Sequence, residues 1–345
     1  MKKWIILWVI LWVCLCGMYG IYEIYGDETH GSAKIEIKKS FSGKSKIFLE
    51  TVAGECTIKK NTGETIEVQY LSSSKGKANE PIFSGTDEEL RLNEKNFISM
   101  LSKSSWIIQA PENTIIFIST VTGDISVSGM KKKTDIRTIS GKIIANEMDG
   151  VTELNAVSGN IDAENITGKT NFFVGNGKLI IKNISGIIGI KTLQGVIEAE
   201  NLNGKVSARM PNGNFRLKSC QGSFEIKTAS GEIWATDTKI TGNSYFRNAS
   251  GDIQVTLGAP PIGDLTLDSA AGKALLNFSG YPLKGYFEFK AISESGEIIA
   301  PLEFDKEEEM EEWGNTYLYK SIKLGSDKPR ISILTSTGEA ILKQK

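Results

Sequence analysis

The chain has 345 residues, enough for two average domains, although repetitive β-architectures of this length often form a single body. Forty basic and forty-one acidic residues leave a net charge of −1, which excludes a strong overall attraction to nucleic acid or an anionic surface. The single histidine, His30, argues against Ser-His-Asp, Cys-His and histidine-ligated zinc chemistry, because each needs an imidazole placed in a folded site.

The first expected element is a membrane segment at residues 4–22. Lys2 and Lys3 precede nineteen uncharged residues, and at about 1.5 Å per residue a helix of that length crosses a hydrocarbon core of roughly 30 Å. Basic residues before it and acidic residues after it predict a cytoplasmic start at residues 1–3, a single pass through the cell membrane and an extracytoplasmic bulk. A cleaved secretory signal and a lipoprotein signal are the alternatives. Residues 23–33 are expected to be a linker.

Residues 34–345 are expected to form one all-β domain. Within residues 34–70, Gly54 and Gly63 lie nine positions apart, which is half of the period described below, so this segment predicts worn coils that cap the N-terminal end. Residues 71–110 break the period. They are expected to be an insertion, either a hairpin or a broad loop.

A repeat of eighteen residues runs through residues 111–258. Apolar and polar residues alternate between its glycines, which is the period of a β-strand rather than of a helix. Chance does not produce so regular a register, so the fold is predicted from the repeat. The glycines that open successive units are Gly123, Gly141, Gly159, Gly177, Gly195, Gly213, Gly231 and Gly251, and those midway are Gly150, Gly168, Gly186, Gly204, Gly222 and Gly242.

A unit of eighteen residues with one apolar face cannot bury that face alone, but stacking on identical units builds a continuous core. The sequence therefore predicts a single-stranded parallel β-helix, or β-solenoid, with about 18 residues per coil. Its glycines are expected at corners, where a left-handed backbone conformation costs least without a Cβ. Residues 259–345 keep the pattern irregularly, which predicts irregular coils and a C-terminal cap, with the acidic stretch 305–312 as a solvated turn or short helix.

The residues predicted to point inward form columns with the same period. One such column lies two positions after each opening glycine, and its members should stack on one another in the core. It comprises Ile125, Ile143, Ile161, Leu179, Ile197, Phe215, Ile233 and Ile253.

Outward residues eighteen apart become surface neighbours in such a stack. One column alternates in charge and predicts a ladder that fixes the register, through Glu164, Lys182, Glu200 and Lys218. A second column is basic throughout and predicts a site for an anion or polymer, such as a polyanionic wall polymer or lipid headgroups, with a solvated face as the alternative. Its members are Lys191, Arg209, Lys227 and Arg247.

No pattern in the sequence predicts catalysis. The outward carboxylates are scattered, and nothing resembles an acid/base pair beside a wall of aromatic residues. Cys56 and Cys220 are expected to be small buried side chains rather than a disulfide or a nucleophile. We therefore expect no enzyme activity, no cofactor and no metal.

The segments "LETVAGECTIKKNTGETIEVQY", "APENTIIFISTVTGDISVSGM" and "LGSDKPRISILTSTGEAIL", together with the run of SGxI coils, carry a family resemblance. Over roughly residues 34–345 the chain resembles the bacterial putative-adhesin family of β-strand-repeat domains. The resemblance implies a β-helix on the cell surface, sometimes linked to envelope-stress systems, with no established catalytic residues. A right-handed coil follows from the resemblance and from the preference of parallel crossovers.

The expected function is that of a non-catalytic, adhesin-like binding or scaffold module on the surface of the bacterial envelope. An accessory or sensor protein of an envelope-stress signalling system is the second interpretation, and a polysaccharide-active β-helix enzyme is the third. The expected partners are the membrane, through residues 4–22, and a cell-wall polymer or an envelope membrane protein. Nucleic acid is not expected as a partner.

Overall fold

The computed structural model describes residues 35–72, 81–94 and 104–345, so the expected cytoplasmic start, membrane segment and linker at 1–33 lie outside the described residues. The compact unit is Lys34–Lys345. All regular elements in its described part are strands, and none of these residues forms a helix with the length and hydrophobicity needed to cross a membrane.

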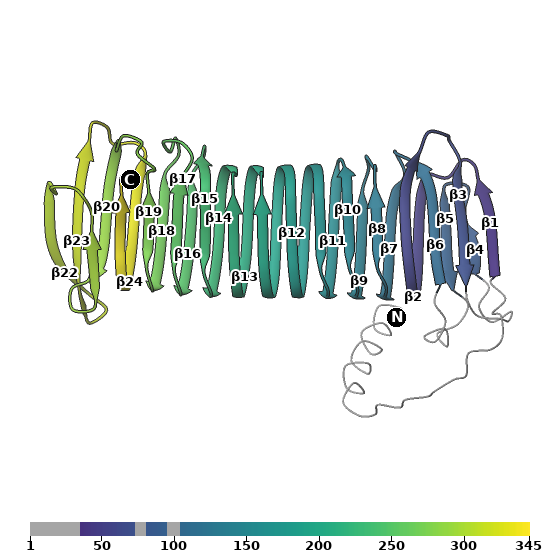
Figure 1. The fold of residues 1–345 in the computed structure, drawn as a ribbon, viewed down its shortest axis with the longest axis horizontal. Coiled ribbons are helices and arrows are strands. Elements are labelled where there is room, and N and C mark those ends of the chain that lie inside the picture. The colour runs from purple at the N-terminus through teal and green to yellow at the C-terminus, as the bar shows by residue number, and fades with distance from the viewer. Residues whose placement is uncertain (1–34, 73–80, 95–103) are drawn as a thin grey trace, which may run out of the picture. The chain divides into compact units, whose positions relative to one another are not determined.

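The strands join in one 24-stranded sheet that is wound into a stack of coils (Figure 1). In the central coils, successive strands pair in parallel with partners eighteen residues apart, as Ile143 does with Ile161 and Leu154 with Phe172. The predicted all-β, solenoid-like repeat fold is therefore confirmed, while its handedness stays a prediction. The central strands are β7 (Ile115–Thr122), β8 (Ile125–Ser128), β9 (Thr134–Ser140), β10 (Ile143–Met148), β11 (Val151–Ser158), β12 (Ile161–Glu200), β13 (Asn203–Lys218), β14 (Gln221–Ser230), β15 (Ile233–Ile240), β16 (Ser244–Ser250) and β17 (Ile253–Leu257).

Each coil contributes a strand to each of two surfaces, which we call face A and face B. The residues of face A pair with those of the next coil along the stack, as β7 pairs with β9 and β9 with β11. Those of face B do the same, as β8 pairs with β10. Face A comprises residues 115–122, 134–140, 151–158, 169–176, 187–194, 205–212, 221–230, 244–250 and 265–271, and face B comprises 125–128, 143–146, 161–164, 179–182, 197–200, 215–218, 233–236 and 253–257.

The predicted inward columns form the core. Ile143, Ile161 and Leu179 have no exposed surface, and each lies on a different coil. The alternation of buried and exposed positions in strand β11 shows why: its side chains point in turn into the stack and into solvent. Burial at about 1.5–3 kcal/mol for each large apolar side chain makes these columns the main stabilising contribution of every coil.

The corner glycines are required mainly because the coils approach one another closely there. At Gly195 φ is +143°, and a Cβ would lie 1.9 Å from the carbonyl oxygen of Gly177, one coil earlier. Such a distance is far inside van der Waals contact, so any side chain would force the coils apart. The same approach, with distances of 1.8 to 2.2 Å to backbone oxygen, recurs at Gly123, Gly141, Gly159, Gly177, Gly213, Gly231 and Gly251.

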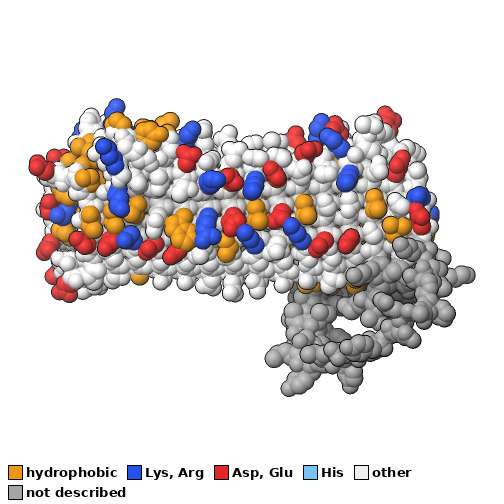
Figure 2. Space-filling view, in the orientation of Figure 1, with side chains coloured by type: hydrophobic (Ala, Val, Ile, Leu, Met, Phe, Trp, Pro, Cys, Tyr) orange, Lys and Arg blue, Asp and Glu red, His pale blue; other side chains and the backbone are white. Residues whose placement is uncertain are grey.

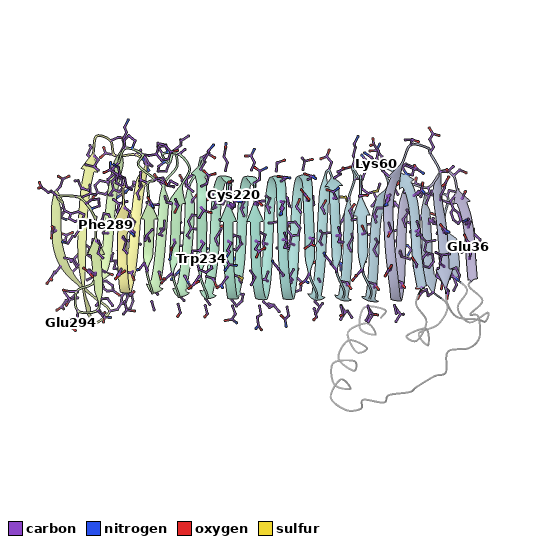
Figure 3. The ribbon with its side chains drawn as sticks, viewed as in Figure 1. Glu36, Lys60, Cys220, Trp234, Phe289 and Glu294 are labelled. Carbon is purple, nitrogen blue, oxygen red and sulfur yellow. The ribbon has the colours of Figure 1, made fainter. Side chains whose placement is uncertain are left out.

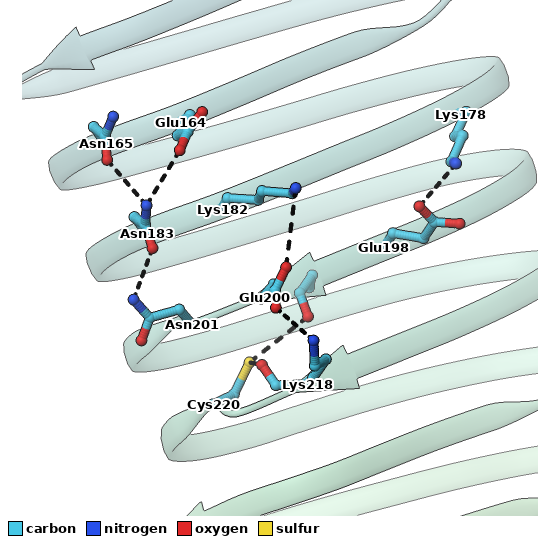
Figure 4. A network of polar contacts seen from close by, with 11 residues as sticks. Glu164, Asn165, Lys178, Lys182, Asn183, Glu198, Glu200, Asn201, Lys218 and Cys220 are labelled. Carbon is cyan, nitrogen blue, oxygen red and sulfur yellow. Dashed lines mark hydrogen bonds and ion pairs between the residues drawn. The ribbon is translucent and has the colours of Figure 1, made fainter.

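A further bend in each coil has no glycine and was missed by the sequence analysis. It is formed by residues with φ between 51° and 56°, a left-handed conformation that Asn and Asp adopt more easily than other residues. Three of these asparagines form a ladder, because Asn183 Nδ2 donates to Asn165 Oδ1 at 3.1 Å and Asn201 Nδ2 donates to Asn183 Oδ1 at 2.7 Å (Figure 4). The bend residues are Glu147, Asn165, Asn183, Asn201, Ser219 and Asp237.

The N-terminal end contains strands within the segment expected as an insertion, residues 71–110. β2 pairs in parallel with β7 and β8 on one side and with β5 and β6 on the other, so β5 and β6 form a further coil beyond β2. Trp106 on β6 is fully buried in that coil, and its Nε1 donates to Glu94 at 3.3 Å. Antiparallel strands β1, β3 and β4 complete this end. The bounds are β1 (Ile35–Phe41), β2 (Lys46–Asn61), β3 (Ile66–Ser72), β4 (Pro81–Gly85), β5 (Glu89–Glu94) and β6 (Ser104–Pro111).

At the C-terminal end, the last strand is inserted into the stack. β24 pairs in parallel with β18 and β19 on one side, and with β20 and β21 on the other. The coil of β20 and β21 therefore does not stack directly on β18 and β19. β24, which comes later in the chain, lies between the two coils. Glu36 and Glu294 lie at opposite ends of the domain (Figure 3). The bounds are β18 (Leu265–Ala271), β19 (Ala274–Asn277), β20 (Gly285–Ile292), β21 (Gly296–Ile299), β22 (Lys306–Glu312), β23 (Asn315–Leu324) and β24 (Arg330–Lys343).

The acidic stretch expected as a turn or short helix is instead strand β22, which pairs antiparallel with β23. Basic residues on the same sheet offset its charge: Lys320 lies 2.8 Å from Glu307, and Lys290 lies 2.6 Å from Glu312. The expectation was wrong because these cross-strand ion pairs are not visible in a local sequence window. A charged strand also suits this position, since charge at the edge of a sheet opposes pairing with a second molecule.

A column of buried threonines gives a testable prediction. Thr152 has no exposed surface, and its Oγ1 has no hydrogen-bond partner among the described residues. A buried hydroxyl without a partner costs about 1–3 kcal/mol, so Thr152→Val is expected to stabilise the domain by about 1 kcal/mol, measured as a higher midpoint of chemical denaturation. Thr138→Val is the matched control, because Thr138 Oγ1 donates to Ser140 O at 3.2 Å, and its loss should destabilise. Equal effects of the two substitutions would contradict the interpretation.

Candidate functional site

The predicted basic column forms a continuous row on face A. Lys191 pairs in register with Arg209, Arg209 with Lys227, and Lys227 with Arg247. Adjacent strands lie about 4.8 Å apart, so four cations follow one another along the stack at that interval. The structure therefore places all four side chains where the sequence predicted them, and whether they bind an anion stays a prediction.

The half of this row nearer the C-terminus is paired with acidic side chains. Lys227 Nζ lies 2.7 Å from Glu225 Oε1, and Arg247 Nε lies 3.5 Å from Asp268 Oδ2. The hydrogen bond and the charge of Lys227 lower the pKa of Glu225 below its usual value. Tyr245 donates to Asp268 at 2.9 Å, and burial, followed by this bond, raises the pKa of Tyr245 to about 12.

The other half of the row forms no direct ion pair, although the charge of Arg209 helps to lower the pKa of Glu225 on the next coil. Neither Lys191 nor Arg209 forms an ion pair with another residue in the part of the chain that the structure describes. Both side chains are exposed. Two adjacent cations without acidic partners repel each other, and an anion placed between them would relieve that repulsion.

Lys191 and Arg209 border a hollow of about 680 Å³ on face A. Gly189, an outward position in the middle of a strand, lines the hollow without a side chain, while the equivalent residues one coil away are Asn171 and Ser207, and Asn171 Oδ1 lies close to where a side chain at Gly189 would begin. Glycine inside a strand often marks a place where a ligand or another backbone approaches closely. The lining comprises Asn155, Asn171, Phe172, Phe173, Gly189, Ile190, Lys191, Ser207 and Arg209.

This hollow was not predicted from the sequence, although a signal was present. Gly189 lies outside both columns of corner glycines, so the repeat itself gives no reason for a glycine there. A second hollow of about 400 Å³ follows on the same face. Its lining includes residues of the coil that carries Ser207 and Arg209, so the two hollows adjoin there. The second lining comprises Lys205, Val206, Ser223, Phe224, Glu225, Asn243, Ser244, Tyr245, Asp264 and Thr266.

Face B carries the predicted ladder of alternating charge. Glu200 lies between two cations, 2.8 Å from Lys218 and 3.9 Å from Lys182 (Figure 4). The bond to Lys218 lowers the pKa of Glu200, and the same contact raises the pKa of Lys218. On the side of the molecule in view in Figure 2, acidic and basic side chains likewise alternate along the coils. These exposed pairs each contribute little to stability because water and salt screen them, and their main effect is on register.

The described residues contain no cluster of metal-binding side chains, and their two cysteines are buried. No group of three or more His, Cys, Asp or Glu side chains among residues 35–72, 81–94 and 104–345 could hold a metal ion. Burial raises the pKa of Cys56 to about 12 and also raises that of Cys220, so both thiols stay protonated. Both are free and buried, which confirms the interpretation of these two as small core side chains.

The fold and this surface define a solenoid-like β-repeat protein with a polar, partly basic face. The family model that matches is described as Toastrack DUF4097, and it covers residues 44–272, about two thirds of the chain. The chain therefore belongs to the Toastrack DUF4097 family, and the predicted relationship to β-strand-repeat domains is confirmed. No curated protein matches the sequence.

Solved structures with similar coverage have low identity to this chain. A "putative cell adhesion protein" from Clostridium sporogenes is 14% identical, with a TM-score of 0.21 over 91% of this chain and 100% of its own. A "putative lipid binding protein" from Parabacteroides distasonis is 12% identical, with a TM-score of 0.30 over 71% of this chain and 89% of its own. A "putative adhesin" from Bacteroides fragilis is 13% identical, with a TM-score of 0.25 over 91% of this chain and 97% of its own.

Proposed function

We propose that this protein is a non-catalytic binding module, anchored in the cell membrane by residues 4–22 and displayed outside it, that binds an anionic polymer of the envelope. The observation that carries the proposal is the basic row of face A, in which Lys191 and Arg209 lie next to each other without acidic partners among the described residues. We also propose that the coils are right-handed, because the connections between parallel strands strongly prefer that hand.

The geometry of the stack suits a polymer better than a single small anion. The cations recur on successive strands about 4.8 Å apart, on a backbone held rigid by parallel pairing on both sides. A polyanion laid along the stack can contact several of them at once, and linked contacts raise the overall affinity without any strong individual site. The accessory or sensor role depends on the membrane segment and stays a second proposal without a specific contact in its favour.

Charge reversal at the unpaired half of the row tests the proposal. The full chain is titrated with polygalacturonate and with long-chain polyphosphate, both anionic, and with neutral dextran as the reference. We expect the double substitution Lys191→Glu and Arg209→Glu to weaken binding of both polyanions at least tenfold, which corresponds to about 1.4 kcal/mol. Binding should also weaken with added salt, because exposed charges are screened.

The paired half of the row provides the matched control. Lys227→Glu and Arg247→Glu make the same change of charge, but these cations already contact Glu225 and Asp268. Their reversal should therefore weaken binding less than threefold. Unchanged binding after reversal of Lys191 and Arg209 would reject the basic row as the site. Absence of binding to either polyanion would reject the function itself.

A further inference from the structure

We propose that the hollow at Gly189 is a subsite for one ring of an acidic glycan, such that a sugar ring lies over Gly189 and its carboxylate contacts Lys191 and Arg209. This inference rests on the proposed function and makes it more specific, because it assigns the ligand to the polyhydroxylated polyanions. The basic row alone would bind any polyanion, whereas a subsite for a sugar ring would favour polyanions that contain such rings.

The shape of the hollow is the first support. On the coil before it, the outward position carries Asn171, and on the coil after it, Ser207, whereas Gly189 between them has no side chain and the Asn171 amide lies beside it. The strand at Gly189 does not need glycine for its backbone, because its φ lies outside the left-handed region. Gly189 is therefore not needed for a turn. It leaves room for the amide of Asn171, whose Oδ1 would lie 2.5 Å from a Cβ at this position, and this amide borders the hollow.

The lining chemistry is the second support. Asn155 and Asn171 offer amide groups, each of which both donates and accepts hydrogen bonds, and Ser207 adds a hydroxyl. Hydroxyl groups of a sugar have the same double character, so amides and hydroxyls complement them well. Phe173 contributes an aromatic ring to one wall, against which the apolar face of a sugar ring can pack.

The charge of the lining selects an acidic sugar over a neutral one. Lys191 and Arg209 border the hollow without a direct ion pair in the described part of the chain, and a guanidinium binds a carboxylate through two parallel hydrogen bonds. A fatty or strongly apolar ligand fits less well. Ile187 and Leu193 are each 57% exposed nearby, yet both lie outside the lining, and Phe172 and Ile190 point into the core.

The second hollow extends the same chemistry toward the C-terminus. Its lining again includes hydroxyl and amide groups, of Ser223, Asn243 and Tyr245, and it begins at Lys205 on the coil of Arg209. It also carries the carboxylates of Glu225 and Asp264, so the rings that lie here are expected to be neutral ones. Because the two hollows adjoin along the stack, a chain of several sugar rings can follow face A beyond the ring at Gly189. The polymer would then run parallel to the stacking direction, as the basic row does.

Filling the hollow tests the inference. In Gly189→Leu the new Cβ would meet Asn171 Oδ1 at 2.5 Å, and that amide is the far end of a side chain that can rotate away. The full chain carrying this substitution is titrated with polygalacturonate and with polyphosphate, which has charge but no ring. We expect affinity for polygalacturonate to fall about tenfold and affinity for polyphosphate to change less than twofold, since a lost pocket affects only the ligand that fills it.

Two further variants keep the test decisive. Asn171→Ala removes an amide without adding bulk. It should weaken the binding of polygalacturonate three- to tenfold and leave the binding of polyphosphate unchanged. Ser119→Leu places the same bulk on face A, at an exposed position outside the hollow, and should change neither affinity. Thermal melts of all variants verify that the coils are intact.

The outcomes separate this inference from the function on which it rests. Unchanged polygalacturonate affinity in both Gly189→Leu and Asn171→Ala would overturn the subsite, while continued sensitivity to reversal of Lys191 and Arg209 would retain the polyanion-binding function. An equal loss for both polymers in Gly189→Leu, or binding of polyphosphate alone by the unaltered protein, would also overturn it. Binding of neither polymer would reject the function and the subsite together.

Discussion

Gly195→Ala is expected to destabilise the domain by about 3–6 kcal/mol, because it combines a strained backbone with a clash that the coil cannot avoid. The φ of +143° at Gly195 is one that residues with a Cβ rarely adopt, and the added Cβ would lie 1.9 Å from Gly177 O. That oxygen belongs to the backbone of the neighbouring coil, so relief requires the coils to separate. Chemical denaturation followed by circular dichroism measures the effect.

Gly63→Ala is the control for that prediction. No atom lies within 4 Å of a Cβ built at Gly63, and its φ lies outside the left-handed region. The substitution should therefore change the free energy of unfolding by no more than about 0.5–1 kcal/mol. Any change should be stabilising, because alanine reduces the conformational entropy of the unfolded chain. Similar midpoints for the two alanine variants would show that close stacking at the corners does not hold the coils in place.

Removal of residues 330–345 is expected to unfold the C-terminal end of the stack. Strand β24 buries Ile331, Ile333 and Leu342, each of which contributes about 1.5–3 kcal/mol, and it separates two coils that do not otherwise pair with each other. Without it, Leu267 on β18 and Phe287 on β20 lose the strand between them. Backbone amides of β20 and β21 should then exchange with solvent much faster than in the intact chain.

The central coils should respond little to that truncation, because each coil of a repeat protein contacts only its neighbours. Amides in β10 and β11 are therefore expected to keep their protection in hydrogen-exchange measurements. A truncation after Lys343, which removes two residues and leaves β24 whole, serves as the control. Continued protection of β20 and β21 in the longer truncation would show that the inserted strand is dispensable.

The central coils could be predicted from the sequence because their interactions are periodic. Ile143 and Ile161 are equivalent in the repeat, so the position of one fixes the position of the other, and the structure pairs them in register. The same period predicts that Glu200 and Lys218 are neighbours, and the structure places them 2.8 Å apart. The ends could not be predicted in this way. β24 is separated by fifty or more residues from β18 and β19, the two strands that it pairs with on one side, and no period links them.

The candidate site shows the same division. The row from Lys191 to Arg247 follows from the period alone, and the structure confirms that these residues are neighbours. Its division into a paired and an unpaired half does not follow, because Asp268 lies twenty-one residues after Arg247, outside the eighteen-residue step. The hollow at Gly189 depends on which side chains surround a missing one, and that required all the neighbouring coils to be placed.

The sequence by itself determined the coil: its length, its buried columns, its corner glycines and the alignment of its charges, because each is set by contacts that repeat at a fixed interval. Only the tertiary structure decided how the stack is closed, which cations are neutralised and where face A is hollow. Those features come from single, unrepeated contacts between distant segments. Their energies depend on shape and charge in three dimensions, which a periodic pattern does not specify.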